Sequence, residues 1–272
     1  MAEVDKAFVG SIPEIYDRYL VPLIFEFYAA DLARRTSELR PHAVLETAAG
    51  TGVVARALAP LLQPGARYTV TDLNPPMLER ARRWLASDAR ITWQQADALA
   101  LPFAEASFDA VLCQFGVMFF PDRIASHREA LRVLKPGGTI LFNFWDRIEE
   151  NDFARLCTVA AGEIFPDDPP LFMARTPHGY YEPDRVRADA EAAGFGDVRI
   201  ETVAHDSEGA SARDVAIAIC QGTPLRNEIE LRDARLLERA TARAAELIAQ
   251  RHGNSAVSGK MQAHVVTATK GR

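Results

Sequence analysis

The chain has 272 residues, of which 48% are hydrophobic and 25% charged, and this is the composition of an ordinary globular protein. A formal net charge of −6 at pH 7 argues against the basic surface of a nucleic-acid binder, so we expect no nucleic-acid partner. The start of the chain lacks signal-peptide features, and its most apolar early stretch, Leu20 to Ala30, is interrupted by Glu26. We therefore expect no membrane span and a cytoplasmic location.

The first predicted element is a helical region from Ser11 to Arg40. From Pro41 to Asp146, apolar strands then alternate with helices. Strands joined by helices in this way form a parallel sheet that helices cover on both faces. We therefore predict an α/β protein with a doubly wound, mostly parallel sheet. The strands predicted in this part are Ala43–Thr47, Tyr68–Thr71, Ile91–Ala96, Phe108–Phe115 and Thr139–Trp145.

The first strand leads into Glu46 and a glycine-bearing turn, with the sequence V-L-E-T-A-A-G-T-G from Val44 to Gly52. Apolar residues follow at helical spacing, so the turn opens a helix. Gly50 and Gly52 allow the backbone to turn tightly and to approach a ligand closely. The helix start offers unpaired N–H groups to a phosphate or a carboxylate. The strand, turn and helix together predict a nucleotide-binding site.

Four successive predicted strands end in polar residues, which are Glu46, Asp72, Asp97 and Gln114. Ligands of open parallel sheets bind outside the carboxyl ends of the strands, so we expect these residues to converge on one crevice. Asp72 can accept hydrogen bonds from ribose hydroxyls, and Asp97 can accept one from an exocyclic amine such as adenine N6. The apolar walls for a flat base are expected from Leu73, Met77, Ala98 and Leu99.

The glycine turn is compatible with two kinds of nucleotide. The run from Gly50 to Ala55 also fits the G-x-G-x-x-A fingerprint of dinucleotide sites, and Asp72 follows at the distance expected for NAD. Three features favour a mononucleoside instead. Glu46 would repel a pyrophosphate, Asp97 suits an adenine at the end of the third strand, and the last strands depart from the repeating order.

The end of the chain has a different pattern. Pro183–Ala193 is predicted to be a helix that Gly194 ends. Strands are predicted at Asp197–Val203 and Gln262–Lys270, with a helical stretch from about Leu225 to Arg251 between them. Since no helix needs to cross between the last two strands, we expect the last strand to be antiparallel.

The segment from Arg147 to Glu182 is predicted to be rich in loops because it contains several prolines. It follows the fifth strand at the rim where loops usually hold substrate, so we expect a lid or an acceptor site there. His178 is the histidine best placed to abstract a proton, although a lone loop histidine is more often structural. The large apolar and aromatic residues of the segment include Phe165, Phe172, Met173, Tyr180 and Tyr181.

These residues resemble the class I S-adenosylmethionine-dependent methyltransferases of the type-11 group. The family's first motif, an acidic residue before a glycine-rich turn, matches Glu46-Thr-Ala48-Ala-Gly50-Thr-Gly52, in which Ala48 replaces the usual glycine. Its ribose-binding acid matches Asp72 in V-T-D-L-N-P-P-M-L, and its adenine motif matches Asp97-Ala98. F-D-A-V-L-C-Q-F-G-V-M-F-F-P and L-K-P-G-G match its fourth strand and a late turn.

The resemblance implies a seven-stranded Rossmann-like methyltransferase fold and S-adenosylmethionine as the cofactor. It also implies one methyltransferase domain over residues 1–272. Its parts would be an N-terminal helical cap (1–40), a cofactor-binding core (41–146), a lid or acceptor-site insertion (147–182) and a C-terminal part with a helical insertion (183–272). The candidate cofactor-binding residues are Glu46, Ala48, Gly50, Gly52, Asp72, Leu73, Met77, Asp97, Ala98, Leu99 and Gln114.

The expected activity is in-line transfer of a methyl group to a small, partly apolar molecule. An NAD(P)-dependent oxidoreductase and a cofactor-binding protein without catalysis are the alternatives. Three scattered cysteines, Cys113, Cys157 and Cys220, suit a reducing compartment and show no metal-ligand spacing, so we expect no metal. The sequence determines neither the acceptor atom nor the oligomeric state, and His178 is its only candidate for a catalytic base.

Overall fold

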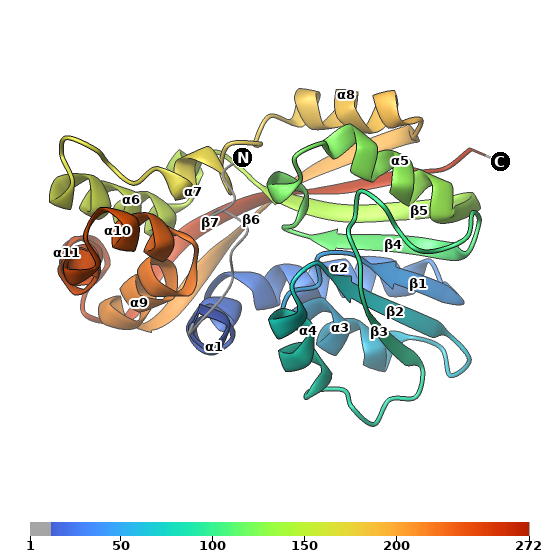
Figure 1. Cartoon of the computed structure of the whole chain (residues 1–272), viewed down its shortest axis with the longest axis horizontal. Coiled ribbons are helices and arrows are strands. Elements are labelled where there is room, and N and C mark those ends of the chain that lie inside the picture. The colour runs from blue at the N-terminus through green and yellow to red at the C-terminus, as the bar shows by residue number, and fades with distance from the viewer. Residues whose placement is uncertain (1–11, 272) are drawn as a thin grey trace. The chain divides into compact units, whose positions relative to one another are not determined.

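The computed structural model describes residues 12–271, and these residues form two compact units. The first, which we call the sheet unit, contains residues 26–144, 182–202 and 264–271. The second, which we call the helical unit, contains residues 12–25, 145–181 and 203–263. Figure 1 labels the helices and strands of both units. The boundaries of the cap, core and insertion that the sequence suggests stay predictions.

The sheet unit is built on a single sheet in which seven strands are described, in the order β3-β2-β1-β4-β5-β7-β6. Strands β1, β2, β3, β4 and β5 pair in parallel, and the last strand is antiparallel. The predicted doubly wound sheet with an antiparallel last strand is therefore confirmed. The strands are β1 Ala43–Glu46, β2 Arg67–Asp72, β3 Ile91–Gln95, β4 Phe108–Gln114, β5 Leu134–Trp145, β6 Gly196–Ser211 and β7 Ser255–Thr269.

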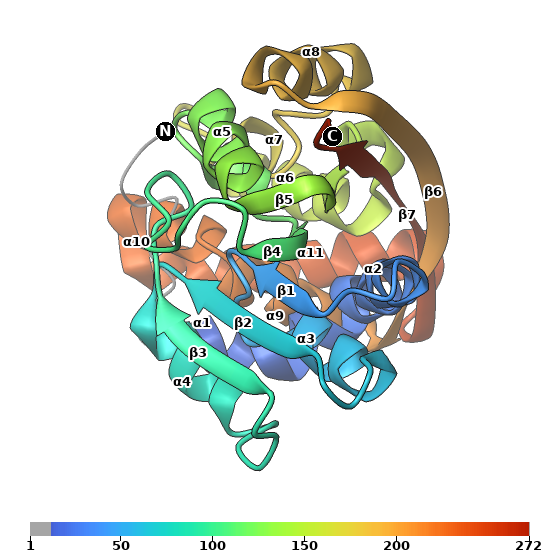
Figure 2. The ribbon, with the colours of Figure 1, turned by 90° about the vertical axis from the view of Figure 1, so that its right-hand side faces the viewer.

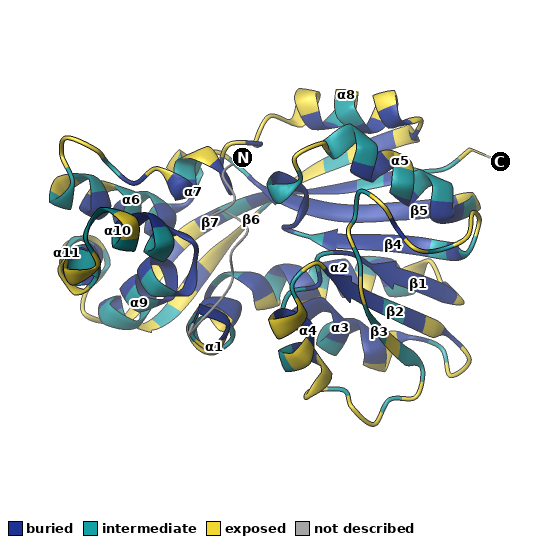
Figure 3. Ribbon diagram, viewed as in Figure 1, coloured by how far each residue is buried: buried dark blue, intermediate teal, exposed yellow. Residues whose placement is uncertain are grey.

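Helices cover both faces of this sheet. In Figure 2, α5 and α8 lie together on one face, and α2 and α3 lie together on the other. All four residues of β1 are buried, as a central strand between two helical layers requires (Figure 3). The helices of the unit are α2 Glu26–Glu38, α3 Val53–Leu58, α4 Pro75–Arg82, α5 Arg123–Val133 and α8 Pro183–Ala193, with short 3-10 turns at Ala59–Leu61 and Val117–Phe119.

The helical unit packs its helices mainly around α9, which contacts α11, α6, α10 and the π-helix η2. The ends of β6 and β7 belong to this unit as well. Its elements are α1 Ile12–Ile15, η2 Tyr16–Phe25, α6 Asp152–Ile164, α7 Phe172–Arg175, α9 Ala212–Gly222, α10 Leu225–Asp233 and α11 Leu237–His252, with 3-10 turns at Ile148–Glu150 and Ala234–Leu236. None of the helices in the described range is both long and apolar enough to cross a membrane.

Most predicted elements appear where the sequence indicates them. Helix α8 has the predicted bounds, and Gly194 ends it with a left-handed φ of 107°. The region predicted to be helical up to Arg40 is helical from Ile12 to Glu38, whereas Ser11 lies outside the described residues. The predicted helical stretch near Leu225 is divided into α10 and α11, which a 3-10 turn separates.

Two local predictions are wrong. The segment 147–182 is not mainly loop, because α6 occupies 13 of its residues and buries an apolar stripe that includes Phe153, Leu156 and Cys157. Its four prolines all follow this helix and do not interrupt it. The predicted turn at Lys135-Pro-Gly-Gly138 lies within β5, which begins at Leu134. The hydrogen bonds from Gly137 N to Lys270 O and from Lys270 N to Gly138 O pair this part of the strand.

Candidate functional site

The glycine turn is tied to the end of β2 by Asp72. Its carboxylate accepts hydrogen bonds from Gly50 N at 2.8 Å and from Asn74 N at 2.7 Å. The side chain of Asn74 makes no helix cap and donates instead to the same carboxylate at 3.3 Å. Asp72 is only 6% exposed, and burial raises its pKa while the bonds from Asn74 and Gly50 lower it. The acid therefore holds the turn in place.

Glu46, at the end of β1, is 1% exposed and accepts a hydrogen bond from the hydroxyl of Tyr68. Burial, opposed by the hydrogen bond from Tyr68 and aided by the charge of Asp72, raises the pKa of Glu46 to about 8. Glu46 is therefore mainly a neutral carboxylic acid at pH 7. Tyr68 was not among the predicted site residues. Its parallel pairing with Val44, two residues before Glu46, could be found only from the strand register.

The turn has left-handed backbone at alternate residues, with φ values of 52° at Ala48, 57° at Gly50 and 78° at Gly52. A side chain at Gly52 would clash, because its Cβ would lie 2.9 Å from Cβ of Ala81 on α4. Ala48 adopts this conformation despite its own Cβ, which costs free energy for any residue other than glycine. The hydroxyl of Thr51 is buried and has no hydrogen-bond partner among the described residues.

Asp97 lies beyond the end of β3, as predicted, and it is exposed. One of its carboxylate oxygens accepts a hydrogen bond from Leu99 N at 2.9 Å, so the side chain forms a turn with its own backbone. Of the residues predicted as apolar walls, Leu73 is 46% exposed, Met77 is buried, and Ala98 and Leu99 are half-buried. The structure thus places an acid and several apolar groups beyond the ends of β2 and β3.

Gln114, at the end of β4, pairs in register with Asn143 of β5. The amide oxygen of Asn143 accepts a hydrogen bond from Phe115 N at 2.8 Å, and Phe115 has a left-handed φ of 49°. The amide nitrogen of Asn143 is buried, and no described residue accepts a hydrogen bond from it. Asn143 was missed by the sequence analysis, although it is a polar residue within the apolar run T-I-L-F-N-F-W. Buried polar atoms without partners are uncommon, and bound ligands are one explanation.

The predicted cofactor residues thus lie together at the carboxyl ends of β1 to β4 in the sheet unit, whereas His178 belongs to the helical unit. Its ring nitrogen Nδ1 lies 2.8 Å from the carbonyl oxygen of Asp146. The side chain is buried, and this burial lowers the pKa of His178 to about 4. A histidine with this pKa is a weak base, which makes it a poor proton acceptor in the role predicted for it.

The site in the sheet unit fits a nucleoside that carries a polar tail. Its strand ends carry acceptor oxygens, and Leu73 offers an exposed apolar surface. Thr51 and Asn143 add buried donors that a ligand oxygen would satisfy. The arrangement therefore meets the chemical needs of S-adenosylmethionine, which carries a ribose, an adenine and an amino-acid tail.

Residues 45–142 match the family model described as a methyltransferase domain. Over 139 residues the chain is 42% identical to the demethylmenaquinone methyltransferase of Clavibacter sepedonicus, and this match covers 50% of the chain and 56% of that protein. The chain spans about half the length of such curated relatives.

Solved structures share the fold. The YcgJ protein of Bacillus subtilis superposes with a TM-score of 0.59 and 21% identity, covering 90% of this chain and 99% of that one. The [4+2]-cyclase SpnF superposes with a TM-score of 0.56 and 18% identity, covering 90% of this chain and 81% of that one. The fold and the family match together confirm the methyltransferase resemblance found in the sequence.

Proposed function

We propose that the class I methyltransferase domain at residues 45–142 makes this chain an S-adenosylmethionine-dependent methyltransferase that acts on a small, partly apolar molecule. The observation that carries the proposal is the bond between Asp72 and Gly50 N, which joins the ribose-binding acid of the family motif to its glycine turn. The assignments of the cofactor and of the acceptor class thus rest both on the family match and on the chemistry of the site.

In this proposal, Asp72 binds the ribose. A carboxylate offers about four lone-pair sites. The bonds from Gly50 N, Asn74 N, the Asn74 side chain and the Leu73 backbone already use these sites, so a ribose hydroxyl has to share or displace one of these donors. Asp97 would accept from the adenine amine. The remaining cofactor-binding assignments are the backbone of Ala48, Gly50 and Gly52, the side chains of Glu46 and Gln114, and the apolar groups of Leu73, Met77, Ala98 and Leu99.

The bound cofactor would supply an activated methyl group on a sulfonium that is also the leaving group. The protein's own residues then have to position the reactants and exclude water. Glu46 enters as a buried neutral acid bonded to Tyr68. A nearby cation would favour its ionised form, so Glu46 is suited to the ammonium group of the cofactor's tail.

The structure and the comparisons bear on two alternatives to a methyltransferase. An NAD(P)-dependent oxidoreductase is disfavoured by the antiparallel last strand. The expected repulsion of a pyrophosphate by Glu46 gives no argument, because this acid is mainly neutral at pH 7. A protein that binds the cofactor without transferring its methyl group has one supporting observation, because the [4+2]-cyclase SpnF shares the fold. Fold alone does not determine chemistry.

Calorimetry with S-adenosylhomocysteine and with NAD tests the cofactor assignment, and release of S-adenosylhomocysteine during an acceptor screen tests catalysis. We expect micromolar S-adenosylhomocysteine binding, equivalent to about 8 kcal/mol. Binding of NAD alone would overturn the proposal, and cofactor binding without turnover on any acceptor would favour the non-catalytic alternative. The absence of a nucleic-acid partner and the cytoplasmic location remain predictions from the sequence.

A further inference from the structure

One part of the sheet unit combines a concentration of arginines with an exposed tryptophan. It consists of residues 56–67, which contain the end of α3 and the 3-10 turn after it, and of residues 79–90, which contain the end of α4 and the loop before β3. We call these two segments the arginine patch. They contain six arginines and two acidic residues, a net charge of +4, whereas the whole chain has a net charge of −6. The positive charge is therefore concentrated in this patch.

Contacts between side chains and backbone tie the two segments together. The guanidinium group of Arg56 lies over the ring of Trp84, 4.6 Å from its centroid. Arg90, at the end of the second segment, donates hydrogen bonds to Ala59 O at 2.8 Å and to Leu62 O at 3.1 Å in the first. The two segments thus form one continuous surface, and none of the candidate cofactor-binding residues belongs to it.

Two large apolar side chains of the patch are exposed to solvent. Trp84 is 54% exposed even though Arg56 stacks on its ring, and Leu61 is 50% exposed. Leu61 lies within the stretch of backbone that Arg90 binds, so it is next to the loop that follows Trp84. Burying such groups against an apolar partner would release free energy that the isolated chain does not gain.

The positive charge of the patch is only partly neutralised within the chain. Arg90 pairs with Asp88 at 2.6 Å. Arg82 and Arg83, just before Trp84, are both exposed. Arg82 donates to the carbonyl oxygen of Trp93 at 2.9 Å, and no acidic side chain among the described residues pairs with Arg82 or Arg83. These two charges are therefore available to an anionic partner.

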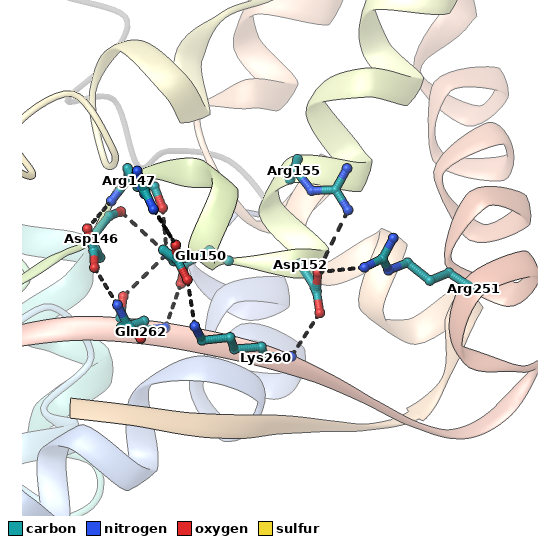
Figure 4. A network of polar contacts seen from close by, with 9 residues as sticks. Asp146, Arg147, Glu150, Asp152, Arg155, Arg251, Lys260 and Gln262 are labelled. Atoms are coloured by element: carbon teal, nitrogen blue, oxygen red, sulfur yellow. Dashed lines mark hydrogen bonds and ion pairs between the residues drawn. The ribbon is translucent and has the colours of Figure 1, made fainter. Parts of the chain in front are cut away.

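The basic side chains of the helical unit show what neutralised charges look like. In the network of Figure 4, Arg147 and Lys260 pair with the carboxylate of Glu150. Arg155 and Arg251 pair with that of Asp152 in the same network. These cations stabilise the unit itself, whereas Arg82 and Arg83 have no such use.

We propose that the arginine patch binds this protein to the surface of an anionic lipid membrane. Arg82 and Arg83 would contact the lipid phosphates, since basic side chains close to an anionic membrane are attracted to it. Trp84 and Leu61 would enter the layer of the head groups, where tryptophan is enriched because its ring is apolar and its N–H polar. This binding is peripheral, needs no helix that crosses the membrane, and does not depend on the proposed function.

A nucleic acid offers phosphates as well, but it accounts for less of the patch. Arginines and a tryptophan suit single strands, on whose bases an aromatic ring can stack. The exposed aliphatic side chain of Leu61 gains nothing from a phosphate backbone, whereas it gains from lipid. A lipid surface is therefore the partner that fits all the exposed groups of the patch.

The test is cosedimentation of the full chain with vesicles of phosphatidylcholine alone and with vesicles that also contain phosphatidylserine. We expect binding to the anionic vesicles to be at least about tenfold tighter and to weaken as salt is added. Bromine on the lipid acyl chains should quench the tryptophan fluorescence of the bound chain. Trp84→Ala, at an exposed position, should remove this quenching.

The decisive variant reverses the two charges, with Arg82→Glu and Arg83→Glu together. We expect it to lose the preference for anionic vesicles. Arg83→Glu alone, at a side chain that bonds to no described residue, should weaken binding at least threefold while the unfolding curve stays that of the wild-type chain. The matched control reverses Arg128 of α5 and Arg239 of α11, which are exposed arginines outside the patch, and should keep the preference.

The proposal is overturned if the wild-type chain binds neutral and anionic vesicles equally, or if the double charge reversal keeps the preference. Binding of single-stranded RNA without binding of vesicles would assign the patch to nucleic acid, and salt-sensitive self-association without binding of vesicles would assign it to a second copy of the chain. Either result overturns the proposal. Calorimetry of S-adenosylhomocysteine tests the proposed function separately, because Arg83→Glu should bind it as the wild-type chain does.

Discussion

Ala48 and Gly116 are packed so closely that only one of the two positions has room for a side chain. A Cβ built at Gly116 would lie 2.6 Å from the Cβ of Ala48 and 2.7 Å from the sulfur of Cys113. Ala48 carries the methyl group where the family has a glycine, and it does so with a left-handed φ of 52°. The turn lacks the family's glycine at Ala48, and Gly116, which follows β4, leaves the space that the Ala48 methyl group occupies.

The first prediction is that Ala48→Gly stabilises the chain. The left-handed conformation costs an alanine about 1–2 kcal/mol, and glycine avoids this cost. Glycine also has more conformational freedom in the unfolded chain, and this offsets about 0.4–1 kcal/mol of the gain. We expect a net gain of about 0.5–1 kcal/mol in the free energy of unfolding, measured with urea. The control is Ala188→Gly at an exposed position within α8, which should lower the free energy of unfolding by about 1 kcal/mol. An equal loss for Ala48→Gly would show that the backbone at Ala48 is not strained.

The second prediction concerns Gly116→Ala, which should destabilise the chain by about 1–3 kcal/mol because it overpacks the contact with Ala48 and Cys113. In the Ala48→Gly background one of these clashes is gone, so the same substitution should cost at least about 0.5 kcal/mol less. A double-mutant cycle in urea measures the difference. Strict additivity would show that the two positions do not share this space.

The third prediction concerns the pH dependence of stability through Glu46, whose pKa burial raises to about 8. The unfolded chain loses this proton near its ordinary pKa of about 4.3, whereas the folded chain keeps it up to about 8. The native state therefore binds more protons between these values, and stability falls as pH rises through this window. Below it, the stabilisation is fully present.

Glu46→Gln keeps a neutral side chain at every pH and should lack this slope. Relative to the variant, we expect the wild-type chain to lose about 2–4 kcal/mol between pH 5 and 8, followed by chemical denaturation. Glu191→Gln, at an exposed residue of α8, is the matched control. Parallel wild-type and Glu46→Gln curves would mean that Glu46 is ionised throughout.

The fourth prediction is that Asp72→Ala weakens S-adenosylhomocysteine binding by about 1.5–3 kcal/mol, since it removes a charged acceptor. It should also loosen the turn, because Gly50 N and Asn74 N lose their partner. Calorimetry measures binding, and a parallel unfolding curve separates it from stability. Asp197→Ala, at an exposed ion pair with Arg199, is the control, and equal effects of the two variants would remove Asp72 from the cofactor site.

The fifth prediction concerns base recognition by Asp97. If its carboxylate accepts from the adenine amine, Asp97→Asn should reduce the preference for adenine over hypoxanthine in the bound cofactor. The turn bond to Leu99 N survives in asparagine, so the backbone should not change. Competition between S-adenosylhomocysteine and its hypoxanthine analogue measures the preference. A preference equal to that of the wild-type chain would assign Asp97 to the turn alone.

The sequence by itself determined the parts of this protein that depend on neighbours in the chain. The strand before Glu46, the turn through Gly52 and the helix after it follow from apolar spacing and glycine, which act within about ten residues. The bounds of α8 followed from Pro183 and Gly194 in the same way. In the segment around α6, prolines indicate loops while apolar residues at helical spacing indicate a helix. The helix forms because the prolines all follow it.

Only the tertiary structure decided which distant groups share a hydrogen bond. Tyr68 reaches Glu46 across neighbouring strands, and Asn143 reaches Phe115 N from 28 residues away. His178 owes its tautomer to Asp146 O, 32 residues earlier. Such pairings depend on strand register and on how helices pack, and burial then sets the protonation of each group. A pattern of residue types contains neither the register nor the burial, so it could name Glu46 and His178 as candidates but could not determine that both are neutral at pH 7.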